Sequence, residues 1–347
     1  MRAIEILSQL AFVLTAAATV PLSAGNSKEH KLESKWVYLA DVEPGAVQEH
    51  GTAATSDELY VIGGVPGNYT TDVPPSRKDV SAYNFRSKRW RSVAPLSLGM
   101  THANAATVHG KVYVLGGLTG SDVNPLWNYT SWCSVYDPET NKWSDLPRMP
   151  EDQARGASAI GVYDSTVYLA GGMRSLYLAP GGLQDSVDIV TAFNVRTRQW
   201  ATLPPLPEPR DHVGGAVIGS KFYVVGGRNH GQDNPKNTTW VLDLEATDDG
   251  WKSKKEMPTA RGGIAIGTIG HHIVTFGGEG NAADPSGVFP QTEAYDTVRD
   301  EWVKLDDMPN PRHGTAAASV DNAILIPGGG ATEGGANPLN VFTSFTF

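Results

Sequence analysis

The stretch Lys221-Phe222-Tyr223-Val224-Val225-Gly226-Gly227 joins a run of apolar β-forming residues to a glycine pair. The same unit occurs six times along the 347 residues. Its glycine pairs are Gly63-Gly64, Gly116-Gly117, Gly171-Gly172, Gly226-Gly227, Gly277-Gly278 and Gly328-Gly329. Successive pairs are separated by 53, 55, 55, 51 and 51 residues. A period near fifty residues indicates an array of repeated structural units.

Each repeat has the pattern of a β-sheet. Every position of the run from Val112 to Leu115 is apolar, which favours a strand buried on both faces between neighbouring sheets. The glycines that follow allow a sharp turn of the chain. A variable polar segment then leads to a tryptophan in five repeats, at Trp90, Trp143, Trp200, Trp251 and Trp302.

Four repeats also carry an arginine 16 residues before the next glycine pair, at Arg155, Arg210, Arg261 and Arg312. Because a residue that recurs at one offset serves the repeat, we expect structural roles for these arginines. The order of the apolar run, glycine pair, tryptophan, proline-rich turn and arginine over roughly residues 35–347 resembles the kelch family. This resemblance implies an all-β, six-bladed kelch β-propeller in which each repeat forms one four-stranded blade.

The two ends of the chain carry complementary parts of one repeat. After Gly329 only one strand-like segment remains, residues 341–347, and it lacks a tryptophan strand. Residues 35–39 form a tryptophan strand with no glycine pair before it. We therefore predict that this N-terminal strand completes the last blade and closes the ring without an open sheet edge. The predicted blades are approximately residues 45–97, 98–150, 151–207, 208–258, 259–310, and 311–347 together with 32–42.

Residues 1–24 have the features of a secretory signal peptide, which leaves a single propeller domain at residues 25–347. Arg2 gives a weakly positive end, the run from Leu10 to Val20 is mostly apolar, and Ala24 is a small residue at the expected cut. The apolar run is short for a bilayer span, so we expect no integral membrane anchor, although an anchor is the alternative interpretation.

Three Asn-X-Thr sites, at Asn68, Asn128 and Asn237, follow glycine pairs and fit N-glycosylation, although such sites also arise by chance. Together with the leader they predict a place in the secretory pathway, either outside the cell or in a vesicular or vacuolar lumen. The formal net charge of −9 disfavours binding to nucleic acid or to an anionic membrane surface. The only cysteine, Cys133, cannot form an intramolecular disulfide.

The segments after the glycine pairs are expected on one side of the propeller. They are approximately residues 65–80, 118–132, 173–188, 228–239, 279–291 and 330–339. They are longer than ordinary hairpin connections, and long loops on a rigid scaffold are often functional. Their apolar side chains suit the wall of a substrate pocket or, alternatively, a cover over the blade ends. The substrate-binding candidates among them are Trp127, Met173, Leu176, Tyr177 and Phe289.

Polar candidates on the same side come from two positions in the repeat. The position 14 residues before each pair holds Glu49, His102, Ala157, His212, Gly263 and Gly314. The residues after the pairs include Arg174, Arg228, Asn229 and Glu279. We expect His102, His212 and Arg228 to be catalytic, because a histidine can move a proton and an arginine can hold an oxyanion. Glu49, Arg174, Asn229 and Glu279 are expected to bind substrate. The alternative is that the histidines satisfy backbone groups between blades.

The sequence predicts no metal site. His271 and His272 are adjacent in an expected strand, where neighbouring side chains point to opposite faces, so they are not expected to share an ion. Copper radical oxidases share a kelch-like fold, but Cys133 has no matching set of ligands around it in the sequence. Neither a phosphate-binding loop nor a hydrolase nucleophile motif is visible.

In its overall organisation the chain also resembles fungal kelch-like biosynthetic proteins that catalyse hetero-Diels–Alder coupling in tropolone and related meroterpenoid pathways. This resemblance implies an enzyme that joins a quinone-methide-type diene to a terpene alkene, with oxygenated and apolar small molecules as partners and no cofactor. Two alternatives stay open. One is a secreted propeller that binds a glycan or a protein without catalysis, and the other is a metal-dependent oxidase or lyase, for which the sequence offers no evident ligands.

Overall fold

The computed structural model describes residues 32–67, 74–121, 124–177 and 183–347. The chain divides into a unit at Met1–Leu32 and a unit at Glu33–Phe347. The strands of the described residues lie in the second unit, and the account below concerns that unit. The predicted signal peptide and Asn68 lie outside the described residues.

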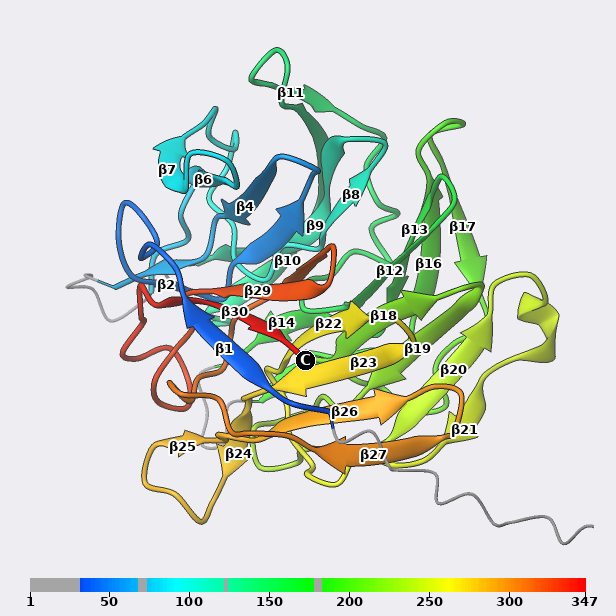
Figure 1. The fold of residues 1–347 in the computed structure, drawn as a ribbon. Helices are drawn as coiled ribbons and strands as arrows, with labels where there is room; N and C mark the ends of the chain where they lie inside the picture. Colours follow the sequence, from blue (N-terminus) through cyan, green and yellow to red (C-terminus); the bar gives the residue numbers. More distant parts are fainter. Residues whose placement is uncertain (1–31, 68–73, 122–123, 178–182) are drawn as a thin grey trace, which may run out of the picture. The chain divides into compact units, whose positions relative to one another are not determined.

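Six antiparallel four-stranded arrangements follow one another along the second unit and form the blades of a propeller (Figure 1). Blade 1 comprises β3 (Gly51–Ala54), β4 (Glu58–Ile62), β6 (Val80–Asn84) and β7 (Arg89–Ser92). Blade 2 comprises β8 (Ala105–Val108), β9 (Lys111–Gly120), β10 (Trp127–Asp137) and β11 (Lys142–Asp145). Blade 3 comprises β12 (Ala159–Tyr163), β13 (Thr166–Ala170), β16 (Val190–Asn194) and β17 (Gln199–Leu203).

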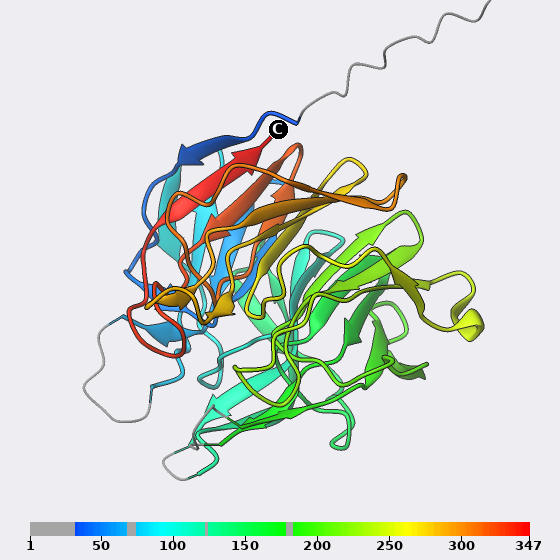
Figure 2. The same cartoon turned by 90° about the horizontal axis from the view of Figure 1, so that it is seen from below.

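The second half of the ring repeats this order. Blade 4 comprises β18 (Gly214–Ile218), β19 (Lys221–Val225), β20 (Thr239–Asp243) and β21 (Lys252–Lys254). Blade 5 comprises β22 (Ala265–Ile269), β23 (His272–Phe276), β26 (Thr292–Asp296) and β27 (Glu301–Lys304). Blade 6 comprises β28 (Ala318–Val320), β29 (Ala323–Pro327), β30 (Phe342–Thr346) and, from the other end of the chain, β1 (Lys35–Tyr38). The first strand of each blade contacts the first strand of the next, so these strands lie innermost. Figure 2 shows the same blades from below.

Short elements are added to the four-stranded blades. They are β2 (Val47–Gln48), β5 (Val65–Pro66), β14 (Met173–Leu176), β15 (Gln184–Ser186), β24 (Glu279–Asn281), β25 (Gly287–Val288) and the 3-10 turn η1 (Thr247–Asp249). Two of them, β14 and β15, extend the sheet of blade 2 through β10. The all-β, six-bladed architecture predicted from the repeats is confirmed. The described residues contain no helix that is both long and apolar enough to span a bilayer.

The pairing of β1 with β30 confirms the predicted closure of the ring. The two strands are antiparallel, with Trp36 opposite Phe345. The Trp36 ring also makes edge contacts with Phe345 and Phe276, at centroid distances of 4.9 and 5.5 Å. The N-terminal strand therefore joins blade 6 by backbone pairing and contacts blade 5 through a side chain.

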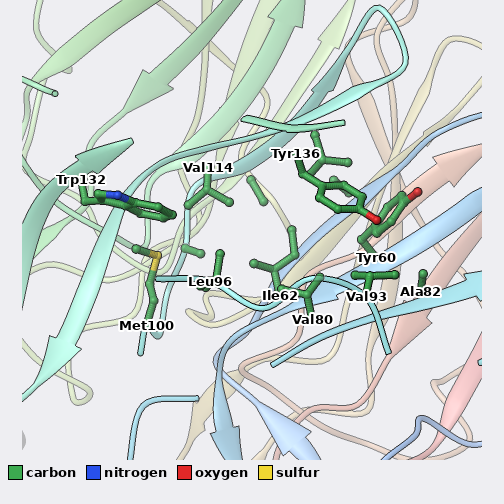
Figure 3. Packing of buried hydrophobic residues seen from close by; sticks show 14 residues of the cluster. Tyr60, Ile62, Val80, Ala82, Val93, Leu96, Met100, Val114, Trp132 and Tyr136 are labelled. Carbon is green, nitrogen blue, oxygen red and sulfur yellow. The ribbon is translucent and has the colours of Figure 1, made fainter. Parts of the chain in front are cut away.

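The hydrophobic core lies between neighbouring blades. Figure 3 shows the cluster between blades 1 and 2, where Tyr60 of β4 meets Tyr136 of β10 edge to face at 5.6 Å. The recurring tryptophans explain part of the repeat, because each donates its indole N–H to a backbone carbonyl about fifty residues earlier. The pairs are Trp90 with Ala40, Trp143 with Ala94, Trp200 with Pro147, Trp251 with Pro204 and Trp302 with Lys255.

The four recurring arginines are completely buried, and their structural role is confirmed. Arg155, Arg210 and Arg261 each donate to the carbonyl of the first glycine in the following pair, and Arg312 donates to the nearby carbonyl of Ile326. Because these carbonyls lie where the second strand ends, each guanidinium satisfies backbone acceptors that the strand no longer pairs.

Candidate functional site

A closed ring of backbone hydrogen bonds surrounds the propeller axis at the start of the innermost strands. Its six members are the residues 14 positions before the glycine pairs: Glu49, His102, Ala157, His212, Gly263 and Gly314. Each amide N–H donates to the carbonyl of the equivalent residue in the preceding blade, at 2.6–3.1 Å, and Glu49 donates to Gly314 to complete the circle. Equivalent residues of all six blades are thereby held at the axis.

Every member of this ring has a left-handed backbone, with φ between 47° and 63°. This conformation costs a non-glycine residue about 1–2 kcal/mol, so Glu49, His102 and His212 are unfavourable at a position where two other blades have glycine. Gly314 is needed for space as well, because a Cβ there would lie 2.5 Å from Oε1 of Glu49. Strained polar residues that gather at one point indicate a functional site.

The side chains of Glu49, His102 and His212 converge on the axis and are almost completely buried. Nε2 of His102 lies 2.9 Å from Oε2 of Glu49 and 2.9 Å from Nε2 of His212. Burial raises the pKa of Glu49, but the charge and hydrogen bond of His102 outweigh it and hold that pKa well below its usual range. Glu49 is therefore a carboxylate at neutral pH.

A second layer of buried charges supports these three residues. Asp211 accepts a hydrogen bond from Nδ1 of His212 at 2.5 Å and lies 3.3 Å from Nε of Arg228. Arg228 also pairs through Nη1 with Glu279, which lies 3.4 Å from Nδ1 of His313. Burial lowers the pKa of His313, but Glu279 raises it to about 9, so His313 is a cation at neutral pH.

The pKa values of Asp211, Glu279 and His212 also depend on burial and on the neighbouring charges. Burial raises the pKa values of both Asp211 and Glu279. The hydrogen bond and charge of His212 nevertheless bring the pKa of Asp211 below its usual range, and the charge of Arg228 does the same for Glu279. Burial and the charge of Arg228 lower the pKa of His212 despite its bond to Asp211. His212 is thus a neutral imidazole whose Nδ1 proton is held by Asp211, which leaves Nε2 as an acceptor or base.

A cavity of about 350 Å³ lies over this polar cluster on the loop side. It is lined by Glu49, Pro74, Leu126, Trp127, Leu176, Tyr177, Gln184, His212, Arg228, Gln232, Glu279, Gly334 and Gly335. A second cavity of about 430 Å³ lies among the innermost strands and is lined by all six ring residues and by many small apolar side chains. Glu49 and His212 line both cavities, so the axial cluster lies between the two.

Strand pairing between neighbouring blades builds the apolar wall of the loop-side cavity. The long strands β9 and β10 extend beyond blade 2, and β10 pairs there with β14, which places Trp127 opposite Leu176. The Trp127 ring contacts the His102 ring edge to face at 4.9 Å. Trp127 and Gln184 both line the cavity, and the buried Trp127 Nε1 and Gln184 Oε1 have no hydrogen-bond partner among the described residues.

The structure brings together most of the predicted site residues. Glu49, Trp127, Leu176, Tyr177, His212, Arg228 and Glu279 line one cavity, and His102 contacts three of them. Four other candidates do not line it. Met173 is completely buried beneath Trp127, and Arg174 stacks over Tyr129 and donates to the carbonyls of Glu151 and Asp152.

The last two of these candidates also point elsewhere. Asn229 donates to Glu208 at 2.8 Å, and Phe289 is buried outside the cavity lining. The repeat position identified these residues as lying after a glycine pair, but side-chain direction alternates along a strand or turn. Adjacent residues such as Arg228 and Asn229 therefore face different surroundings.

Asp211 and His313 were not anticipated, although each directly follows a recurring arginine. The sequence does distinguish these two residues, because Asp211 and His313 occupy a repeat position that holds Gly156 and Gly262 in two other repeats. An ionisable residue at a position occupied elsewhere by glycine can be recognised from the repeat alignment.

The prediction for His271 and His272 is wrong. His271 lies in the turn before β23, so strand alternation does not separate the two side chains. Their rings lie 4.2 Å apart, and their Nε2 atoms are 3.7 and 3.8 Å from Oδ2 of Asp296, which makes a group able to hold an ion at the surface.

Of the described glycosylation candidates, Asn128 is exposed on β10 and Asn237 is half-buried, with its amide donating to Glu256 at 3.2 Å. Asn237 lies between β19 and β20, in the segment expected from the sequence, whereas Asn128 lies near the start of β10, the third strand of blade 2.

Comparison with known proteins agrees with the fold. Residues 173–346 match the model of the KLHDC2/KLHL20/DRC7 Kelch-repeats domain, and residues 48–97 and 100–150 match the Kelch motif. The chain is similar to "Kelch-like protein terF" of Aspergillus terreus, with 40% identity over 87% of this chain and 66% of the relative.

More distant similarities connect it to animal proteins. Kelch-like protein 34 of Homo sapiens is 26% identical over 73% of this chain and 38% of its own length, and beta-scruin of Limulus polyphemus is 26% identical over 78% and 29%. The chain thus spans less than two thirds of the length of each of these curated relatives. Because one kelch model matches half of the chain and the structure has the corresponding six four-stranded blades, the chain belongs to the kelch-repeat family.

Proposed function

We propose that this protein binds two small molecules in the loop-side cavity and joins them by a hetero-Diels–Alder reaction. One partner is an electron-poor oxygenated diene, such as a quinone methide, and the other is an apolar alkene, such as a sesquiterpene. In this reaction the carbon and oxygen ends of the diene form one C–C and one C–O bond to the alkene carbons. No atom is lost, and no oxidant or reductant is required.

The observation that carries this proposal is that apolar and polar side chains together line one cavity of about 350 Å³. Leu126, Trp127 and Leu176 give an apolar wall, while His212, Arg228 and Glu279 give a polar one. Such a cavity suits one hydrocarbon partner and one partner with a polar oxygen, and its volume lies in the ordinary range for small-molecule sites.

Most of the barrier to such a coupling can be lowered by holding the two partners in a reactive geometry away from water. The protein then needs donors at the diene oxygen, where negative charge develops. Arg228 uses Nε and Nη1 for Asp211 and Glu279, and no hydrogen-bond partner of Nη2 is found among the described residues. Nη2 of Arg228 and Nε1 of Trp127 are therefore the two donors that we assign to the diene oxygen.

His212 can also generate the diene in the cavity. A hydroxymethyl phenol becomes a quinone methide when it loses its phenolic proton and its hydroxyl group, which leave together as water. Nε2 of His212 is placed to accept the phenolic proton because Asp211 fixes the proton on Nδ1. The imidazole of His212, which lines the cavity, can return that proton to the departing hydroxyl, and His102 lies 2.9 Å from the same nitrogen.

We also propose that the mature chain begins near Gly25, enters the secretory pathway and carries N-glycans at Asn128 or Asn237. The exposed position of Asn128 supports this proposal.

The proposal is tested by the rate of adduct formation from a hydroxymethyl-phenol precursor and a sesquiterpene alkene. Trp127→Phe removes one donor but keeps an aromatic wall, and Arg228→Lys keeps the charge but removes Nη2. We expect each change to lower the rate by about tenfold, the effect of one hydrogen bond made in the transition state.

Matched controls are Trp132→Phe and Arg174→Lys, which alter a buried tryptophan and a loop-side arginine outside the cavity lining. Both are expected to retain the wild-type rate. Wild-type rates in Trp127→Phe and Arg228→Lys would remove these assignments. No acceleration by the wild-type protein would instead favour a propeller that binds a glycan or a protein partner.

A further inference from the structure

Three ligand-type atoms at the propeller axis lie at the distances of a metal site. The triangle formed by Oε2 of Glu49, Nε2 of His102 and Nε2 of His212 has sides of 2.9, 2.9 and 4.0 Å. A triangle with these sides has a circumradius of about 2.0 Å, so one point is equally close to all three atoms. Zinc and related ions bind imidazole nitrogen and carboxylate oxygen at about 2.0–2.2 Å. We propose that Glu49, His102 and His212 bind one divalent first-row transition ion at this point.

Outer hydrogen bonds orient both imidazoles as they do in protein metal centres. Nδ1 of His212 donates to Asp211, and Nδ1 of His102 lies 3.0 Å from Oγ1 of Thr101. A carboxylate behind a histidine fixes the tautomer, turns the free nitrogen toward the ion and makes it more basic. The Asp211–His212 pair therefore has the same form as the carboxylate–histidine support found behind bound zinc.

The buried charges leave room for a cation. Three carboxylates, those of Glu49, Asp211 and Glu279, lie buried around the two imidazoles. Arg228 pairs with Asp211 and Glu279. The carboxylate of Glu49 faces the two imidazoles instead, at 2.9 Å from His102 and 4.0 Å from His212.

The ligand set predicts what else the ion binds. A divalent ion held by one carboxylate and two neutral imidazoles keeps one positive charge, which favours an anionic oxygen ligand such as hydroxide, a phenolate or an enolate. In the triangle Glu49 and His212 lie nearly opposite each other across the ion, with His102 at about a right angle to both. Such an arrangement of nitrogen and oxygen ligands suits a tetragonal or octahedral ion with open positions, and Glu49 and His212 both line the loop-side cavity.

This inference does not rest on the coupling reaction, because ion binding is measured without any organic substrate. The proton transfer given above to Nε2 of His212 belongs to the metal-free protein, since a bound ion would occupy that nitrogen. The experiment titrates metal-free protein with Co²⁺ and follows its visible absorption and its stoichiometry. His271→Ala/His272→Ala serves as the parent protein, since that surface group could bind ions on its own. We expect one Co²⁺ per chain in this parent, with ligand-field bands that Zn²⁺ abolishes by displacement.

Variants then identify the ligands. Glu49→Gln should weaken binding at least a hundredfold, and Asp211→Asn should weaken it by about 10–100-fold through the orientation of His212. Near-ultraviolet circular dichroism establishes that each variant is folded. Absence of stoichiometric Co²⁺ binding in the parent, or unchanged affinity in folded Glu49→Gln, overturns the proposal.

A measurement on the unaltered ligands covers the case in which these variants do not fold. Proton NMR of the Co²⁺-loaded parent should show two strongly shifted, exchangeable resonances from Nδ1–H of His102 and His212. Loss of both signals in D₂O supports the proposal. A spectrum without shifted exchangeable signals overturns it.

Discussion

Replacing Arg228 by methionine should destabilise the protein strongly, and the size of the effect follows from what the guanidinium touches. Arg228 is 3% exposed and lies between Asp211 and Glu279, which are 0% and 2% exposed. Methionine fills much of the same space but removes the cation that both carboxylates share, and it leaves His313 as the remaining cation beside Glu279. Breaking a buried ion pair from one side costs about 3–5 kcal/mol, so we expect a loss of that order in the free energy of unfolding at pH 7.

The loss should depend on pH in a defined direction. In the wild type, folding lowers the pKa values of Asp211 and Glu279. The two carboxylates therefore contribute their full stabilisation above their unfolded-state pKa values, near pH 4. This stabilisation is lost as the pH falls through their folded-state pKa values. In Arg228→Met the folded-state pKa values of both carboxyls rise, because the opposing charge is gone while burial persists. The deficit relative to wild type should therefore shrink between pH 7.5 and pH 5.

Urea unfolding followed by tryptophan fluorescence measures both effects. The double variant Arg228→Met/Glu279→Gln is the matched control, since it removes one of the stranded charges together with the cation. It should recover about half of the loss if the stranded carboxylates cause it. A loss below about 1 kcal/mol in Arg228→Met, or a deficit that grows toward pH 5, would refute the reasoning.

Three further outcomes are expected. Trp36→Ala should lower the free energy of unfolding by about 2 kcal/mol or more through loss of its ring contacts. Val37→Ala, at an exposed position of the same strand, should change it little. Equal effects of the two substitutions would contradict closure of the propeller by β1. Burial raises the pKa of Cys133 to about 12, so the native thiol should resist a disulfide reagent at pH 8 and react only after unfolding; rapid native reaction would argue against the buried position. Protein from a eukaryotic host should gain mobility after N-glycosidase treatment, and Asn128→Gln or Asn237→Gln should reduce that shift; an intact mass equal to the unmodified 347 residues would count against glycosylation.

The fold could be predicted because its determinants repeat. Six apolar runs at a nearly constant spacing specify six similar sheets, and Trp36 without a glycine pair identifies the strand that completes the last one. The repeated residues proved structural, as Arg155 and Trp90 illustrate. Features that recur in every blade are thus accessible from one sequence.

The candidate site depends on departures from the repeat, and these are harder to interpret. The shared position of Glu49, His102 and His212 was evident, but their mutual distances depend on a backbone hydrogen-bond ring and on left-handed φ values that no sequence pattern specifies. Trp127 and Met173 are apolar residues of two neighbouring loop segments, yet only Trp127 lines the cavity. The register of β10 with β14 decides which of the two side chains is covered.

The stereochemistry of the coupled product tests the central claim most directly. Protein, a hydroxymethyl-phenol precursor and a sesquiterpene alkene are mixed, and the adduct is resolved by chiral chromatography beside a protein-free reaction. Because the cavity has one apolar and one polar wall, the proposed function predicts faster adduct formation and a marked excess of one enantiomer. A rate and an enantiomer ratio equal to those of the protein-free reaction, across a panel of dienes and alkenes, would contradict it.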